Sequence, residues 1–173
     1  MNQSEKRFSI EVESTNGKCP IGETIGNRNI NERRTPVLSC EGACIRGEIA
    51  RQAANMVARQ APYSRGCHGE LLTVPDSSIA RWFTTASKVV LIDGCFLRCH
   101  GRILERLLDR NRLIQFDALA VYRKYTDIFE VGDVPEVERL AAARKVADHV
   151  LACLAQGEKT DGGEPPREEG CSR

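Results

Sequence analysis

Five of the eight cysteines fall in three turns that each follow a predicted β-strand. They are Cys40 and Cys44, Cys67, and Cys95 and Cys99. Four thiolates at about 2.3 Å from the ion form a closed structural Zn²⁺ site, and soft thiolates equally suit an iron–sulfur cluster. We therefore interpret these cysteines as candidate metal ligands, with zinc as the first choice and an iron–sulfur cluster as the alternative.

The composition argues against several other classes of protein. The formal net charge is only +1, so no strong basic field would draw the chain to nucleic acid or to a membrane surface. No apolar run approaches 18 residues, and Met1–Arg7 lacks the apolar core of a signal peptide. We expect a cytoplasmic protein with neither of these partners. In that reducing compartment, clustered cysteines more often bind metal or do redox chemistry than form disulfides.

The segment around Cys95 and Cys99 indicates which elements would position the thiols. Val89–Asp93 is apolar apart from its last residue, which is typical of a short buried parallel strand. Apolar residues then recur at helical spacing after Cys99, so both cysteines are expected in a turn between a strand and a helix. We expect Gly94 to let the backbone bend there. Asp93 is expected to accept hydrogen bonds from amides of the turn.

The same order of elements is predicted around Cys40 and Cys44. Thr35–Ser39 has the composition of a core strand, and an apolar stripe between Ile49 and Val57 predicts a helix after the cysteines. The next segment, Tyr63–Val74, predicts a strand followed by a loop that carries Cys67. A further helix is expected to start at Asp76–Ser78, where good N-cap residues occur.

The rest of the pattern predicts the fold class. Phe116–Tyr122 is expected to form another strand, and a long helix should start near Pro135 and reach about Gln156. Strands that alternate with helices predict a single α/β domain, a three-layer sandwich with a mainly parallel sheet of about four strands. Because the carboxyl ends of parallel strands meet at one edge, cysteines far apart in sequence can converge there.

Three regions are expected along the chain. Residues 1–34 form an N-terminal arm, with a possible edge strand at Phe8–Val12 and a linker at Asn27–Arg34. Residues 35–156 form the α/β domain. Residues 157–173 are predicted to be a disordered tail, since their composition cannot bury enough apolar surface. The edge strand could pair with a second copy of the chain and so form a homodimer.

Two alternatives to metal binding remain open. Cys40 and Arg46 form a Cys-x5-Arg pattern between a strand and a helix, as in cysteine phosphatases and some arsenate reductases, where the thiolate attacks and the arginine holds the oxyanion. Glu41 and Gly47 argue against it, because one places negative charge in an anion loop and the other replaces a supporting hydroxyl. A dithiol redox pair, Cys40 with Cys44 or Cys95 with Cys99, is the other alternative.

Several short motifs, taken together and in order, resemble those of the DGC-domain family, which is named for its Asp-Gly-Cys motif. They are Cys40-x-Gly42-Ala43, Cys67, Ile92-Asp93-Gly94-Cys95 with Cys99, and Tyr125-Thr126-Asp127. The resemblance covers about residues 36–155 and implies a zinc-binding protein whose ligands correspond to Cys40, Cys67, Cys95 and Cys99. Two features depart from the family pattern. Cys44 stands where a small residue such as Ser is expected, which implies a fifth ligand or a different ion, and the N-terminal arm lies outside the pattern.

Two histidines complete the set of candidate donors. His68 and His100 directly follow Cys67 and Cys99, and either imidazole could replace a thiolate as a ligand. No general base, cofactor-binding loop or substrate pocket is evident. The sequence therefore favours a protein that binds an ion, with zinc as the first choice and its cysteines as the ligands, over an enzyme.

Overall fold

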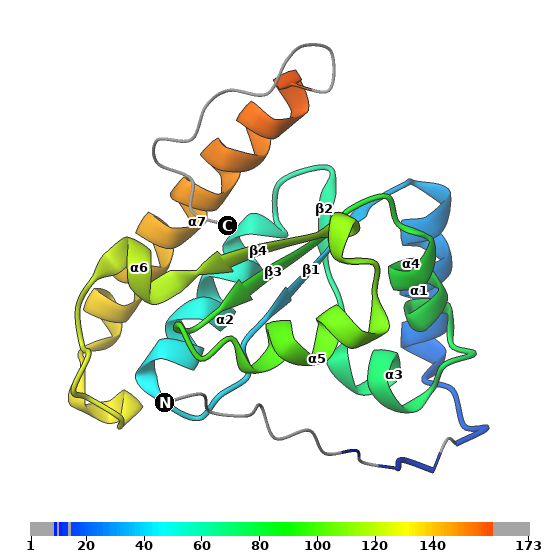
Figure 1. The fold of residues 1–173 in the computed structure, drawn as a ribbon, viewed down its shortest axis with the longest axis horizontal. Coiled ribbons are helices and arrows are strands. Elements are labelled where there is room, and N and C mark those ends of the chain that lie inside the picture. Colours follow the sequence, from blue (N-terminus) through cyan, green and yellow to red (C-terminus); the bar gives the residue numbers. More distant parts are fainter. Residues whose placement is uncertain (1–8, 10, 14, 161–173) are drawn as a thin grey trace, which may run out of the picture.

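Four parallel strands form one sheet in the order β2-β1-β3-β4 (Figure 1). The computed structural model describes residues 9, 11–13 and 15–160. The strands are β1 (Thr35–Ser39), β2 (Tyr63–Arg65), β3 (Val89–Asp93) and β4 (Leu113–Asp117). All five residues of β3 are buried, as expected of a central strand covered on both faces. The predicted α/β class and parallel sheet are confirmed.

Helices cover both faces of the sheet. One face carries α2 (Ile45–Val57), α6 (Ala118–Tyr122) and α7 (Glu136–Thr160). The other carries α1 (Pro20–Asn31), α3 (His68–Thr73), α4 (Ser78–Thr85) and α5 (Cys99–Leu107). Short 3₁₀ turns lie at Arg110–Arg112 and Val131–Asp133. No helix in the described ranges combines the length and the apolar character needed to cross a membrane.

The alternation of side chains along the strands builds two separate cores. Val90 and Ile92 of β3 pack with α2 and α7, while Val89 and Leu91 pack with α4 and α5. Successive side chains of a strand point to opposite faces, so one five-residue strand supplies both cores. Both cores fix β3, and with it the turn that carries Cys95.

The N-terminal region differs from the prediction. The predicted linker at Asn27–Arg34 is wrong, because Asn27–Asn31 form the last part of α1. This helix packs on α4, and the Glu23 carboxylate accepts hydrogen bonds from the Ser78 amide (2.6 Å) and hydroxyl (2.9 Å). The edge strand predicted at Phe8–Val12 includes Phe8 and Ile10, which lie outside the described residues, so it stays a prediction.

Three other predicted elements also need correction. The strand predicted at Phe116–Tyr122 ends at Asp117, whose carboxylate caps α6 by accepting from the Ala120 amide at 3.3 Å. The loop predicted after β2 contains helix α3. Residues 157–160 of the predicted tail continue α7, and 161–173 lie outside the described residues.

Candidate metal centre

The five candidate cysteines lie at the carboxyl edge of the sheet, as predicted from the alternation of parallel strands with helices. Cys40 directly follows β1, and Cys44 is the N-cap of α2. Cys67 is the N-cap of α3, Cys95 lies two residues beyond β3, and Cys99 begins α5. We call these five residues the thiol rim. All five are free cysteines, and Cys67 and Cys99 are exposed.

Glycines bring the turns after β1 and β3 into direct backbone contact. A Cβ atom on Gly94 would lie 2.9 Å from the Arg46 carbonyl carbon and oxygen and 3.0 Å from the Gly47 nitrogen. A Cβ atom on Gly47 would lie 2.2 Å from the Gly42 carbonyl oxygen. The backbone does bend at Gly94, as expected from the sequence, but the close approach is what requires glycine at this position. This contact seats the Asp-Gly-Cys turn on the first turn of α2.

Cys40 occupies the middle of the thiol rim and is half-buried. The Gly42 amide donates to its sulfur at 3.4 Å, and the Gly94 amide also points to it. Burial raises the pKa of the Cys40 thiol, and the charges of Asp93 and Cys99 raise it further. The two amides act in the opposite direction but do not cancel this rise. Cys40 is thus electrostatically coupled to Cys99, which lies beyond the neighbouring strand.

One end of the thiol rim, which we call the tyrosine end, consists of Cys44, Cys95, Arg46 and Tyr122. Burial acts to raise the pKa of Cys44, but the Gly47 and Arg46 amides and the Arg46 side chain together lower it. The Tyr122 hydroxyl is buried without a hydrogen-bond partner, and burial raises its pKa. Tyr122 also interacts electrostatically with Arg46, Cys44 and Cys95, which places them together.

The opposite end, which we call the histidine end, consists of Cys67, His68, Cys99 and His100. The two imidazole rings meet edge to face, with centroids 4.7 Å apart and planes at 68°. The His68 Nε2 and His100 Nδ1 atoms are buried without a hydrogen-bond partner. Burial, and then the neighbouring His100, lower the pKa of His68 to about 4, so this ring is neutral at pH 7. A neutral imidazole is the form that binds metal ions.

This ring contact also shows that two turns of the backbone approach each other. His68 directly follows Cys67 after β2, and His100 directly follows Cys99 after β3, yet β1 lies between these two strands. The turns after the two outer strands of this trio therefore reach toward each other over the end of β1, where Cys40 lies.

Asp93 holds the turn of β3 against the start of α5. Its side chain is only 1% exposed, and it faces the amides of His100 and Gly101 without forming a hydrogen bond of good geometry. Burial raises the pKa of this carboxyl, while those amides act to lower it. The sequence predicted hydrogen bonds from amides of the turn, but the amides that Asp93 faces belong to the first turn of α5, the helix that Cys99 begins.

The contacts of the turn after β1 do not assemble the anion cradle of a cysteine phosphatase. The Arg46 side chain acts on the thiol of Cys44 and helps to lower its pKa, while the Ile45 amide donates to the Phe129 carbonyl oxygen at 2.9 Å. Glu41 pairs with Arg65 of β2 at 3.1 Å. The thiol with the lowered pKa is Cys44, whereas the nucleophile of the Cys-x5-Arg pattern would be Cys40.

In the part of the chain that the structure describes, no three Cys, His, Asp or Glu side chains are grouped closely enough to hold one ion as they stand. A shared ion would therefore require side-chain rotation. Cys67 and Cys99 are exposed at the first turns of their helices, so their thiols can turn without disturbing either core. The donor types, soft thiolates with unpartnered neutral imidazole nitrogen, are those of a zinc site.

Sequence reasoning missed two features of this site. Tyr122 was expected in a strand, and its position beside Cys44 and Cys95 depends on the turn into α6. The contact between His68 and His100 was not foreseen either, although each directly follows a candidate ligand in the sequence, which was the available signal.

Comparison with known proteins agrees with the motifs. The family model described as the DGC domain matches residues 36–150, more than half of the chain. The chain therefore belongs to the DGC-domain family. No curated protein and no solved structure gives a significant match.

Proposed function

We propose that this protein binds a metal ion, with zinc as the first choice, through thiolates of the thiol rim. The ligands are drawn from Cys40, Cys67, Cys95 and Cys99, with Cys44 next. The observation that carries the proposal is the contact between His68 and His100, because it draws the turns bearing Cys67 and Cys99 together over Cys40.

The protein's own residues support thiolate ligation in different ways. Cys99 opens a nine-residue helix, and the partial positive charge at a helix N-terminus attracts anionic groups. Cys40 has a raised pKa in the metal-free protein, so it would release its proton only when the ion binds. A bound zinc ion would cross-link the three turns and neutralise the charge of the thiolates.

The two imidazoles and Asp93 would support these ligands. His68 and His100 each have a buried ring nitrogen without a hydrogen-bond partner, so either could complete the coordination if a thiolate does not reach the ion. Asp93 keeps α5 in register with β3. We place the protein in the reducing cytoplasm, where the five thiols would stay available for an ion.

Elemental analysis of protein purified without oxygen or chelator tests the proposal. We expect about one zinc per chain, which should be lost in a Cys99→Ser variant. Cys19→Ser is the matched control, because Cys19 is also an exposed cysteine at a helix N-terminus but does not follow a strand of the sheet. If the analysis finds iron and inorganic sulfide instead of zinc, the thiols hold an iron–sulfur cluster. Metal-free protein, or zinc retained in Cys40→Ser, Cys67→Ser and Cys99→Ser alike, would contradict the proposal.

A further inference from the structure

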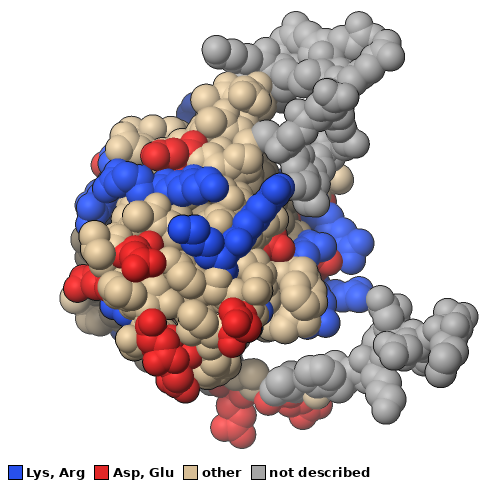
Figure 2. All heavy atoms as spheres, turned by 90° about the vertical axis from the view of Figure 1, so that its left-hand side faces the viewer, with Lys and Arg blue, Asp and Glu red and all other residues tan. Residues whose placement is uncertain are grey.

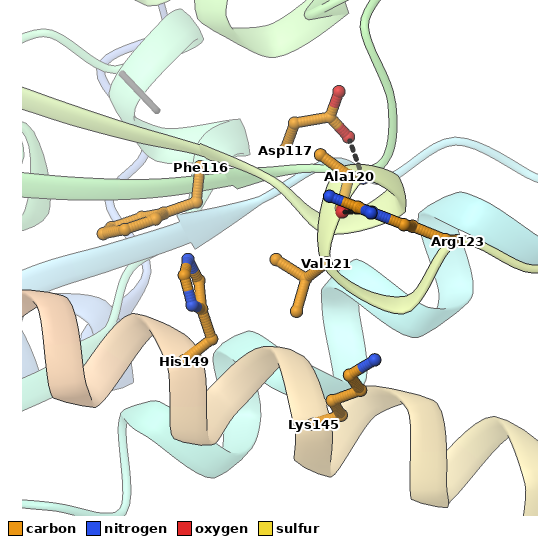
Figure 3. A pocket seen from close by; sticks show the side chains of 7 residues that line it. All are labelled: Phe116, Asp117, Ala120, Val121, Arg123, Lys145 and His149. Carbon is orange, nitrogen blue, oxygen red and sulfur yellow. Dashed lines mark hydrogen bonds between the residues drawn. The ribbon is translucent and has the colours of Figure 1, made fainter. Parts of the chain in front are cut away.

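A second concave site lies between β4, α6 and α7. It is a cavity of about 400 Å³, and no cysteine of the thiol rim lines it (Figure 3). Its walls come from the end of β4, from α6 and from two consecutive turns of α7. The side chains that matter are those of Phe116, Asp117, Val121, Arg123, Lys145 and His149.

Two basic side chains face each other across this cavity. Arg123 follows the end of α6 and Lys145 projects from α7 (Figure 3). The Arg123 Nε atom donates to the Ala120 carbonyl oxygen at 3.0 Å, which fixes the guanidinium at the wall and leaves its terminal nitrogens available. Among the described residues, no carboxylate forms an ion pair with Arg123 or Lys145.

The acidic group of the cavity is already engaged. The Asp117 carboxylate accepts the Ala120 amide as the cap of α6, so it is held at the wall by that bond. Figure 2, which views the molecule from the side of α6 and α7 in Figure 1, shows Lys and Arg side chains in a band across the upper half of this face. Arg123 and Lys145 outnumber the single carboxylate of Asp117 in the lining of the cavity, and this positive balance favours an anion.

An apolar wall lies beside the basic pair. Phe116 and His149 meet edge to face, with ring centroids 6.4 Å apart, and Val121 lies between that contact and the basic side chains (Figure 3). Phe116 is fixed by β4 and packs into the core of that face. Such a wall accepts the body of a small organic ligand, while basic groups hold its charged end.

We propose that this cavity binds a small organic anion, with its phosphate or carboxylate group between Arg123 and Lys145 and its flat ring against Phe116 and Val121. Guanidinium and ammonium groups bind both kinds of anion through charge-assisted hydrogen bonds. The site is separate from the thiol rim, so the inference does not depend on metal binding.

Calorimetric titration of the full-length protein at low ionic strength tests this. Phenylphosphonate and benzoate carry a ring and one of the two anionic groups, methylphosphonate lacks the ring, and benzyl alcohol lacks the charge. We expect at least one ring-bearing anion to bind at least about tenfold more tightly than both incomplete probes, because each lacks one half of the recognition. Whichever of phenylphosphonate and benzoate binds more tightly identifies the anionic group that the site prefers.

Variants locate the binding. Lys145→Met and Arg123→Gln should each weaken the preferred anion about tenfold, the loss expected for one charge-assisted hydrogen bond. Arg144→Ala is the matched control, since it removes the same charge from the neighbouring, exposed position of α7 and should change affinity less than twofold. Equal binding of charged and neutral rings, no binding of either anion at 10 mM, or an equal loss in the control would overturn the proposal.

Discussion

The two ends of the thiol rim present cysteines in different surroundings. At the tyrosine end, Arg46 helps to lower the pKa of Cys44, and the buried hydroxyl of Tyr122 lies close by. At the histidine end, Cys67 and Cys99 are exposed beside two imidazoles that have buried nitrogen atoms without partners. A thiolate already satisfied by a cation has less to gain from a metal ion than one that is not. The comparison therefore teaches that five cysteines on one edge are not five equivalent ligands.

Removing single thiols should separate the two ends most strongly. We expect Cys99→Ser to weaken zinc binding by more than about a hundredfold, since even outer-shell changes cost about 10–100-fold. Cys44→Ser should weaken it by less than about tenfold, because the charge of Arg46 already favours the thiolate form of Cys44. Competition with a chromogenic zinc chelator measures both affinities.

Circular dichroism of the two metal-free variants provides the control for folding in this comparison. Equal losses from Cys99→Ser and Cys44→Ser in folded protein would show that the two ends contribute alike, and the distinction between them would have to be abandoned.

The close contact at Gly94 allows a second, smaller test. Gly94→Ala would place a Cβ atom 2.9 Å from the Arg46 backbone, and backbone cannot yield as a flexible side chain does. We expect it to lower the free energy of unfolding by about 1–3 kcal/mol, the usual cost of overpacking. Urea denaturation of the metal-free protein measures this loss.

Gly69→Ala is the matched substitution at the histidine end. Its Cβ atom would meet only the Cys67 sulfur at 3.7 Å, an ordinary contact, so stability should change by less than about 0.5 kcal/mol. If both substitutions had the same effect, the close approach of the two turns would not be what makes glycine necessary at position 94.

The sequence was informative wherever burial followed a simple period. β1 and β3 were predicted with their observed bounds, because a short apolar run in an alternating α/β pattern has few other interpretations. Helix α1 was missed because its sequence is rich in Gly and Asn and has no strong apolar stripe. Contacts with α4 offset this weak propensity, including the bonds from Ser78 to Glu23 and the close approach of Gly26 to the Ser78 backbone.

The candidate site was predictable to the same degree. The predicted alternation of parallel strands with helices placed the five cysteines at one edge of the sheet, and the structure agrees with that placement. The division into two ends was not predictable, because it depends on side chains that arrive from elsewhere. Tyr122 comes from a helix that the sequence suggested was a strand, and Arg46 turns to Cys44 instead of Cys40. Such contacts follow from three-dimensional packing and produce no periodic pattern in the sequence.

The stability of the histidine end should also depend on pH. The pKa of His68 in the folded, metal-free protein is about 4, below its ordinary value of 6.5, because burial and His100 disfavour the charged ring. Between these values the unfolded chain binds a proton at His68 that the folded chain does not. Stability from this group is therefore full above pH 6.5 and falls progressively as the pH decreases toward 4. His68→Asn should flatten this part of the stability profile, measured by urea denaturation at several pH values without metal.

Tyr122→Phe is the control from the tyrosine end, because a phenol with a raised pKa does not titrate in this range. An unchanged slope in His68→Asn would mean that the ring is not held neutral by its surroundings, and the contrast between the two ends would lose its electrostatic basis.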